Sequence, residues 1–310
     1  MPKSSRTLRQ LAVHIVRGFL MGSADLVPGV SGGTIALVLG IYERLIRAIH
    51  TGASAVTLAL SGKWKEAVNR FRATEWQLLA PLLAGILLAV ASLSTLLEHL
   101  LERAPQNTSA LFFGLVVGSI SITWRFLSSW TPWRIVGTVI MAVTTFATLG
   151  LRSEEIVDPA AALFLGAGAI AIIAMVLPGI SGSFILLMLG MYGSVLSAIN
   201  DRQFALLGLF LLGAIVSLGL FSTLLDQLLR RYRDTAMALL IGLMSGSLRV
   251  LWPWPDGTET SNLAAPESLT APILLAFAGV VLVISISQIG SRRTASDIPK
   301  INQRTDQPPD

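Results

Sequence analysis

Residues 27–49 of the chain read VPGVSGGTIALVLGIYERLIRAI, and residues 177–199 read LPGISGSFILLMLGMYGSVLSAI. At this offset of 150, eleven of the 23 positions are identical. Each copy places a Pro-Gly pair and a cluster of small polar residues inside an apolar stretch, where a helix would otherwise continue. Paired Gly/Pro interruptions at corresponding positions of two halves are typical of the substrate site of transporters built from repeats.

The composition is that of a membrane protein. Of the 310 residues, 53% are apolar and only 13% are charged, and the mean hydropathy is +0.69. Apolar runs such as 76–101 and 270–290 reach the roughly 17–25 residues that cross a bilayer as helix. The net charge of +5 is dispersed between these runs, which favours basic cytoplasmic loops over a nucleic-acid surface. With no cysteine and three scattered histidines, neither a disulfide nor a metal site is expected.

The repetition continues beyond the motif at an offset of 128, where STLLE at 94–98 corresponds to STLLD at 222–226. Each half is therefore predicted to hold a broken segment followed by three uninterrupted helices. The predicted divisions are a cytoplasmic N-terminus 1–10, a first repeat 11–150 (hairpin 11–49, cytoplasmic loop 50–75, helices 76–101, 109–127 and 133–150), a second repeat 161–290 (hairpin 161–199, helices 204–229, 237–252 and 270–290) and a disordered cytoplasmic tail 291–310.

The length of the broken segment determines the topology. Its roughly 39 residues would run about 58 Å as one helix, which is too long for a single crossing of a ~30 Å hydrocarbon core. The segment must fold back at the Pro-Gly pair, either as a re-entrant hairpin or as two crossings, so each half crosses an odd number of times. We therefore expect an all-α polytopic protein of two inverted-topology repeats, each a Pro-Gly-broken, re-entrant hairpin plus three transmembrane helices.

Loop charge supports the same arrangement. Segments 151–160 and 253–269 carry mostly acids and are expected outside, whereas basic segments are expected in the cytoplasm together with both termini. In loop 50–75, Trp64, Val68 and Phe71 recur at helical spacing beside basic residues. This spacing fits a short amphipathic helix in the membrane interface, or else a solvated loop. The basic segments are the N-terminus, 50–75, 125–134, 229–236 and the tail.

The duplicated motif predicts a pocket for an anion. Ser31 and Ser181 stand where an N-cap belongs, at the start of helices predicted to run to about residues 49 and 199. Two helix N-termini that meet near the midplane would offer free N–H donors and partial positive charge to a phosphate. Alternatively, the motif only lets two hairpins pack tip to tip. The expected phosphate-binding residues are Gly29, Ser31, Gly32, Gly33, Thr34, Gly179, Ser181, Gly182 and Ser183, with Arg17 and Arg249 facing either the anion or the interface.

Asp25 lies three residues before Pro28, close to the predicted hairpin tip, and Met175 takes its place in the second half. An acid inside a membrane is costly and indicates function. We expect Asp25 to couple transport to H⁺ or Na⁺, unless it forms a structural ion pair with an arginine. Glu43 is a second candidate for ion coupling, although its i, i+4 spacing from Arg47 favours a surface ion pair. No catalytic residue and no resident cofactor are expected.

The string GFLMGSADLVPGVSGGTIALVLGIYERL at 18–45, with AMVLPGISGSFILLMLGMY at 174–192, resembles the polyprenyl-phosphate translocase family. The likeness covers about 11–290. It implies a flippase that returns undecaprenyl phosphate from the outer to the cytoplasmic leaflet of a bacterial plasma membrane, which recycles the lipid carrier of cell-wall synthesis. It also implies inverted repeats with re-entrant hairpins. The expected partners are then the polyprenyl-phosphate lipid and membrane lipids.

Two other functions fit the motif less well. PGVSGGT also resembles the PG-x-S-R-S-G-x-T loop of the undecaprenyl-pyrophosphate phosphatases, which share an inverted-repeat design. The arginine position of that loop is Gly32 in one copy and Gly182 in the other, and the glutamate-rich motif of those enzymes is missing. Phosphoryl transfer would then have little to stabilise its transition state. A channel for small anions or ions is the third possibility.

Overall fold

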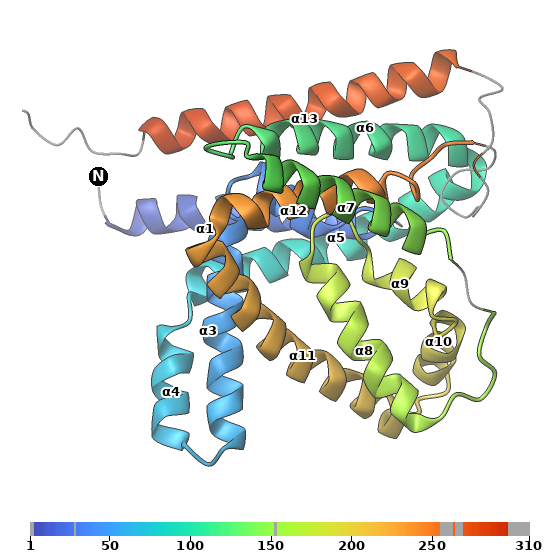
Figure 1. The fold of residues 1–310 in the computed structure, drawn as a ribbon. Coiled ribbons are helices and arrows are strands. Elements are labelled where there is room, and N and C mark those ends of the chain that lie inside the picture. Colours follow the sequence, from blue (N-terminus) through green and yellow to red (C-terminus); the bar gives the residue numbers. More distant parts are fainter. Residues whose placement is uncertain (1–2, 28, 152–153, 255–262, 264–268, 297–310) are drawn as a thin grey trace, which may run out of the picture.

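A computed structural model describes residues 3–27, 29–151, 154–254, 263 and 269–296, and all the regular structure in these ranges is helical (Figure 1). The helices are α1 Lys3–Asp25, α2 Gly32–Val38, α3 Tyr42–Leu60, α4 Trp64–Ala73, α5 Trp76–Arg103, α6 Pro105–Trp124, α7 Pro132–Thr148, α8 Ala161–Val176, α9 Gly182–Met188, α10 Tyr192–Asn200, α11 Phe204–Arg231, α12 Arg233–Ser247 and α13 Thr270–Ser296.

Several of these helices have the dimensions of membrane spans. Among the described residues, α5, α6, α11 and Thr270–Gln288 of α13 are long and apolar enough to cross a bilayer. The pair α9 and α10, bent by 110° at its break, adds a fifth if it counts as one span. At 17 and 15 residues, α7 and α12 are shorter. The chain is therefore an all-helical, multi-pass membrane protein, as the sequence predicts.

The two halves repeat each other in backbone detail. At the ends of α2 and α9, Leu39 has φ −78° and ψ −2°, and Leu189 has φ −78° and ψ −3°. Before α5 and α11, which both have 28 residues, Glu75 has φ −78° and ψ 67°, and Gln203 has φ −77° and ψ 69°. These pairs stand at the offsets of 150 and 128 that the sequence repeat has, so the duplicated sequence forms a duplicated local structure.

Helix pairs correspond between the halves as well. Helix α1 packs along α5 as α8 packs along α11, and α6 packs along α13 as α12 packs along α7. The last two pairs join different halves, because α13 belongs to the second half and α7 to the first. The corresponding helices α6 and α12, one from each half, also contact each other (Figure 1).

Glycines allow these helices to approach at backbone distance. A Cβ at Gly18 would collide with the Leu82 carbonyl of α5, and one at Gly168 with the Phe210 carbonyl of α11. The spaced pairs Gly114/Gly118 and Gly242/Gly246 likewise lie against the backbones of α13 and α7. Small residues at such contacts are how helices associate in a bilayer, where water exclusion does not drive them together.

The helices that begin at Ser31 and Ser181 do not run to residues 49 and 199, so this part of the sequence prediction is wrong. Both end after seven residues in a Schellman motif, with Gly40 at φ +66° and Gly190 at φ +67°. In the first copy the N–H of Ile41 donates to the Ala36 carbonyl at 3.0 Å, which is the bond expected of that motif. The chain then turns sharply into α3 or α10.

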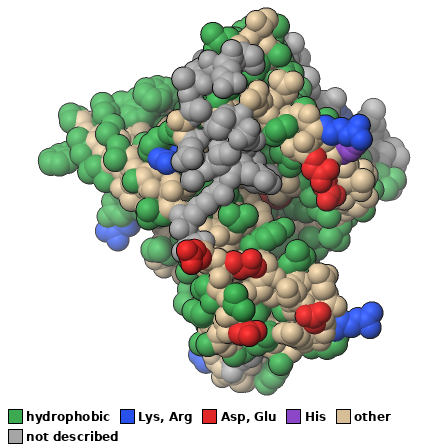
Figure 2. All heavy atoms as spheres, turned by 90° about the vertical axis from the view of Figure 1, so that its right-hand side faces the viewer, with side chains coloured by type: hydrophobic (Ala, Val, Ile, Leu, Met, Phe, Trp, Pro, Cys, Tyr) green, Lys and Arg blue, Asp and Glu red, His purple; other side chains and the backbone are tan. Residues whose placement is uncertain are grey.

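Within segment 50–75, the short helix that the sequence allowed as an alternative to a solvated loop is present as α4 from Trp64 to Ala73, and α3 also continues into the segment as far as Leu60. On the opposite side of the molecule, Glu154, Glu155 and Asp158 are exposed between α7 and α8. Figure 2 shows acidic side chains on this face. Basic and acidic connections therefore lie at opposite ends of the long helices (Figure 1).

Substitutions of the glycines that end α2 and α9 test this assignment directly. Gly40→Ala should lower the free energy of unfolding by about 1–2 kcal/mol, because an alanine there must adopt a left-handed backbone, although no atom lies within 4 Å of its Cβ. Gly190→Ala should cost more, since its Cβ would also collide with the Glu154 carbonyl. Gly208→Ala, inside α11 with open space around it, is the control and should not destabilise. Thermal unfolding in detergent measures all three, and equal melting temperatures would contradict this assignment.

Candidate functional site

The broken segments of the two halves meet through hydrogen bonds. In each bond, a side chain of the first half reaches a backbone group just before or within the second Pro-Gly turn. The bonds join Ser31 Oγ to the Met175 carbonyl (3.2 Å), the Gly179 N–H to Thr34 Oγ1 (2.8 Å) and Tyr42 Oη to the Val176 carbonyl (3.2 Å). The structure thus brings together the two motif copies that the sequence singled out.

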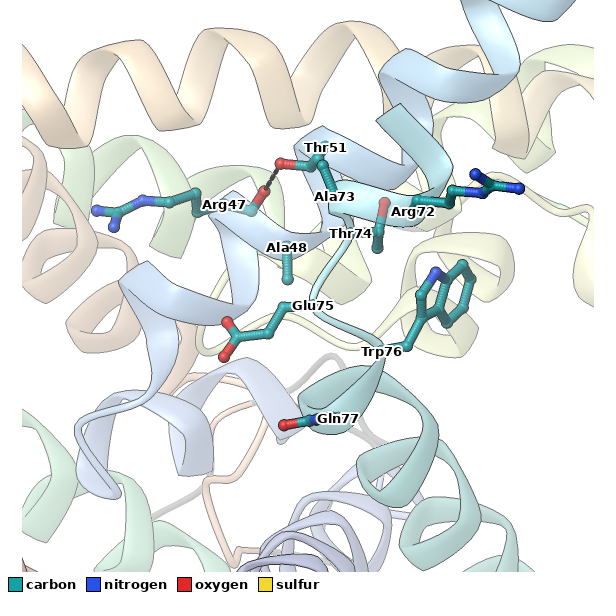
Figure 3. A pocket seen from close by; sticks show the side chains of 9 residues that line it. All are labelled: Arg47, Ala48, Thr51, Arg72, Ala73, Thr74, Glu75, Trp76 and Gln77. Atoms are coloured by element: carbon teal, nitrogen blue, oxygen red, sulfur yellow. Dashed lines mark hydrogen bonds between the residues drawn. The ribbon is translucent and has the colours of Figure 1, made fainter. Parts of the chain in front are cut away.

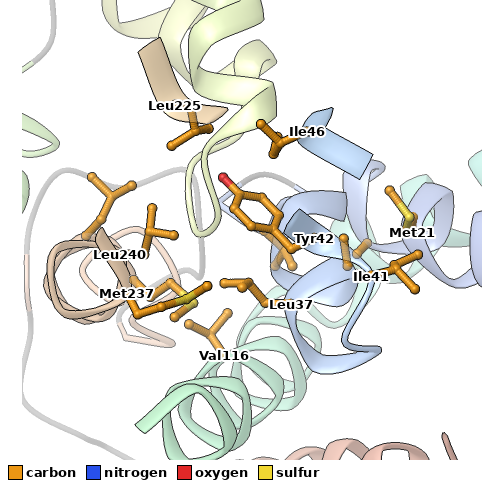
Figure 4. Close-up of a cluster of buried hydrophobic side chains, with 14 of the residues drawn as sticks. Met21, Leu37, Ile41, Tyr42, Ile46, Val116, Leu225, Met237 and Leu240 are labelled. Atoms are coloured by element: carbon orange, nitrogen blue, oxygen red, sulfur yellow. The ribbon is translucent and has the colours of Figure 1, made fainter. Parts of the chain in front are cut away.

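Tyr42 holds this contact in place from the apolar core. Its side chain is only 2% exposed, and Figure 4 shows its ring among apolar side chains of α2, α3, α11 and α12, including Leu37, Ile46 and Met237. The ring therefore cannot turn away without opening the main core. Tyr42 was not among the predicted site residues, although its identity in both copies of the motif was a signal.

The N-terminus of α2 is already capped by an acidic side chain of the chain itself. The Gly32 N–H donates to Asp25 Oδ1 at 2.5 Å, and the Gly33 N–H donates to Ser31 Oγ at 3.1 Å. The Thr34 N–H donates to the Ser31 carbonyl at 2.9 Å. In this conformation the first donors of α2 are satisfied, and Asp25 serves as a cap, a role that sequence reasoning missed.

The N-terminus of α9 differs from that of α2. Met175 replaces Asp25, and its side chain lies where a Cβ on Gly182 would be, just as the Asp25 carboxylate covers Gly32. Ser181 makes no capping bond. Its hydroxyl instead lies 2.8 Å from that of Ser183, which is exposed. The second copy therefore presents polar groups that the first copy uses internally.

The motif glycines serve close packing in this structure. Gly29 and Gly179 have φ of +83° and +88°, which favours glycine at both positions. A Cβ on Gly29 would contact Val250, and one on Gly179 would contact Ser247 of α12. A Cβ on Gly33 would lie 3.0 Å from the Val176 carbonyl. Pro28 lies outside the described residues. The tip-to-tip packing that the sequence allowed is thus present.

Among the predicted charged residues, Glu43 has a different partner from the one expected. It pairs with Arg233 at the start of α12, with 2.6 Å between Oε1 and Nε, so the predicted pair with Arg47 is wrong. Helix packing decides this, because α12 brings Arg233 to the first turn of α3. Among the described residues no arginine lies within 4.0 Å of the Asp25 carboxylate, so the predicted alternative of an arginine pair is not formed.

Arg17 lies within α1, about two turns before Asp25, and Arg249 follows the end of α12. Arg17 is half-buried in α1. The Arg249 guanidinium lies 4.6 Å from the centre of the Phe146 ring and covers Gly150. It follows α12 directly and is next to Val250, which contacts Gly29. Arg249 therefore adjoins in sequence a residue that lies against the first Pro-Gly turn, while its guanidinium lies against α7.

A cavity of about 550 Å³ lies elsewhere, between α3, α4 and the start of α5. None of the predicted phosphate-binding residues lines it. Figure 3 shows that Arg47 and Arg72 point away from each other across this cavity, so they do not converge on one anion. Its lining residues are Arg47, Ala48, Thr51, Arg72, Ala73, Thr74, Glu75, Trp76 and Gln77.

The fold and the joined segments define the chain as a multi-pass α-helical membrane protein of two related halves. Residues 21–269 match the sequence model of a family described as undecaprenyl phosphate translocase-like. Because this match spans most of the chain, the protein belongs to that family, as the sequence motif predicts.

Curated relatives agree with this assignment. The chain is 38% identical over 255 residues to the polyprenyl-phosphate transporter of Vibrio cholerae, covering 82% of this chain and 81% of the relative. It is 35% identical over 258 residues to the polyprenyl-phosphate transporter of Staphylococcus aureus, covering 78% and 86%. No solved structure gives a significant match.

The two N-cap serines should differ in their contribution to stability. Ser31→Ala leaves the buried Gly33 N–H and the part-buried Met175 carbonyl without these partners, so it should cost about 1–3 kcal/mol of unfolding free energy. Ser181→Ala removes only a bond to an exposed hydroxyl and should cost under about 1 kcal/mol. Denaturation of both variants in detergent checks this, and an equal loss would mean that the Ser31 bonds are not formed.

Proposed function

We propose that this protein transports undecaprenyl phosphate, or a closely related polyprenyl phosphate, from the outer to the cytoplasmic leaflet of the bacterial plasma membrane. The observation that carries the proposal is the anion-accepting N-terminus of α2, which lies where the two broken segments meet. Moving a phosphate through hydrocarbon without partners costs tens of kcal/mol in the Born limit. The meeting tips would bind the head group while the polyprenyl tail stays in lipid.

The phosphate first engages the second motif copy. Ser181 and Ser183 offer hydroxyl donors there, beside the N–H groups at the start of α9, and no acid stands in the way. The phosphate then replaces the Asp25 carboxylate at Gly32 as the tips separate. That step frees Ser31 and Thr34 to donate as well. The remaining proposed contacts are Gly29, Gly33, Gly179, Gly182, Arg17 and Arg249.

Asp25 is the proposed coupling residue, because its carboxylate occupies the position that the head group needs. A phosphate carries about −1.5 to −2 charge, so an ionised Asp25 would repel it strongly in a dry site. Binding of H⁺ or Na⁺ to Asp25 would release Gly32 and admit the lipid. Glu43, held by Arg233 at the start of α12, is less suited to this role because its charge is already compensated.

The proposed topology is a pair of inverted repeats with re-entrant hairpins. It is supported by the matched helix pairs, by the 110° bend between α9 and α10, and by the exposed acids between α7 and α8. Both termini would then lie in the cytoplasm, and the acidic connection would lie outside.

A pyrophosphatase mechanism gains no support from the tips. The positions that hold arginine in those enzymes are Gly32 and Gly182, and each is covered by a side chain, Asp25 or Met175.

Single cysteines test the topology without background, because the chain has none of its own. In right-side-out vesicles, an impermeant maleimide should label Glu155→Cys and Glu102→Cys and leave Lys63→Cys and Arg231→Cys unlabelled. Permeabilised vesicles should label all four, which controls for reactivity. Labelling of Lys63→Cys and Glu155→Cys from the same side would rule out inverted repeats.

Asp25→Asn tests the coupling. The neutral amide can still accept a weaker hydrogen bond from the Gly32 N–H, so the fold should persist, but the side chain can no longer take up a proton or offer a charged oxygen to a sodium ion. Polyprenyl phosphate binding should survive, whereas stimulation of uptake by an imposed proton or sodium gradient should disappear in proteoliposomes. Asp226→Asn is the control, because that buried acid pairs with Arg230 within α11 and makes no contact with the motif glycines, and its loss should leave the stimulation unchanged. Wild-type stimulation in Asp25→Asn would exclude a coupling role.

A further inference from the structure

Helix α4 has an apolar face that no part of the described chain covers. Trp64 is 68% exposed, Val68 47% and Phe71 53%, and their spacing of four and three residues places them on one side of the helix. Ala67 is the only buried residue of α4, at 5% exposure, where the helix packs on α3. Ala67 lies beside Trp64 and Phe71 by the same helical spacing, so α3 covers one edge of the apolar face and the rest of it stays exposed.

The first residue of α5 extends this face. The Trp76 ring lies 4.7 Å from the Phe71 ring, and its indole N–H donates to the Phe71 carbonyl at 2.8 Å. The ring is still 42% exposed. Two aromatic rings are therefore fixed side by side at the surface, which costs entropy that solvent exposure alone does not reward.

Basic residues flank the apolar face on both sides. Within α4 and its N-cap, four bases stand against the single acid Glu66, and none of the four forms an ion pair with a described residue. Figure 3 shows that Arg72 and Trp76 point to the same side of the junction between α4 and α5. The four bases are Lys63, Lys65, Arg70 and Arg72.

The position of α4 in the fold matches a helix that lies along a membrane surface. In Figure 1 the α3–α4 pair projects beside the main body and runs across the direction of α6 and α13. Since α6 and most of α13 have the length and composition of spans, a helix crosswise to them lies in the plane of the bilayer.

We propose that α4 and Trp76 form a docking surface for acidic phospholipids of the leaflet beside it. Trp64, Val68, Phe71 and Trp76 enter the boundary between head groups and acyl chains, while the flanking bases bind lipid phosphates. Charge attraction adds to the insertion of the apolar side chains. Each base near an acidic membrane surface contributes about 1 kcal/mol, which strengthens binding about fivefold. This surface is separate from the transport site and does not depend on the proposed substrate.

Spin labels on the full-length protein test the docking by depth. In nanodiscs containing phosphatidylglycerol, the relaxation of a nitroxide label on Val68→Cys should be enhanced more by oxygen, which partitions into lipid, than by a water-soluble nickel chelate. Glu66→Cys, on the opposite side of the same helix, is the matched control and should show the reverse preference. Labels at both positions that respond equally to the chelate would overturn the proposal.

The second arm tests the charge. In phosphatidylcholine nanodiscs the Val68 label should lie shallower than in phosphatidylglycerol, and a Lys65→Gln/Arg72→Gln background should abolish that difference. Arg125→Gln, which removes one exposed base at the end of α6, should leave it intact. A lipid-independent depth would refute acidic-lipid binding. Dipolar broadening between labels of two chains would show that a second copy covers the face instead, and would equally refute it.

Discussion

The rest of the structure depends on the hydrogen bonds that the two broken segments make with each other. A Pro-Gly turn in an apolar stretch leaves carbonyl and N–H groups without helical partners, and these groups must be paired elsewhere in the protein or face water. The chain resolves this by making each half the partner of the other. Ser31 and Tyr42 bind carbonyls at the end of α8, and Thr34 accepts from the second turn. Two breaks that would each be unfavourable alone are stable only together.

This mutual dependence explains the asymmetry between the two copies. A symmetric pair of capped tips would have no free polar group to offer a substrate, and a symmetric pair of open tips would leave buried donors unsatisfied. The first copy is closed by Asp25 and Ser31, whereas the second has Met175 and an exposed Ser183 in the same neighbourhood. The proposed exchange of Asp25 for a phosphate uses this difference, since one anion replaces another on the same N–H group.

The long helices could be predicted from sequence because apolar length is a property of the chain itself. The runs expected at 76–101 and 204–229 are helices over Trp76–Arg103 and Phe204–Arg231. The break at Gly40 was missed, although the Leu-Gly pair is identical in both copies and Gly is the usual residue after a helix end. The Asp25 cap and the Glu43–Arg233 pair could not be found this way, because both depend on how the turn and α12 are placed in space.

The central claim is that this chain moves a phosphate-bearing polyprenyl lipid across the bilayer. The most direct measurement follows labelled undecaprenyl phosphate between leaflets of proteoliposomes that contain the purified wild-type protein. The account predicts movement faster than in protein-free vesicles, competition by unlabelled polyprenyl phosphate but not by polyprenol, and no inorganic phosphate released from undecaprenyl pyrophosphate. A rate equal to that of empty vesicles, or phosphate release that depends on the protein, would contradict it.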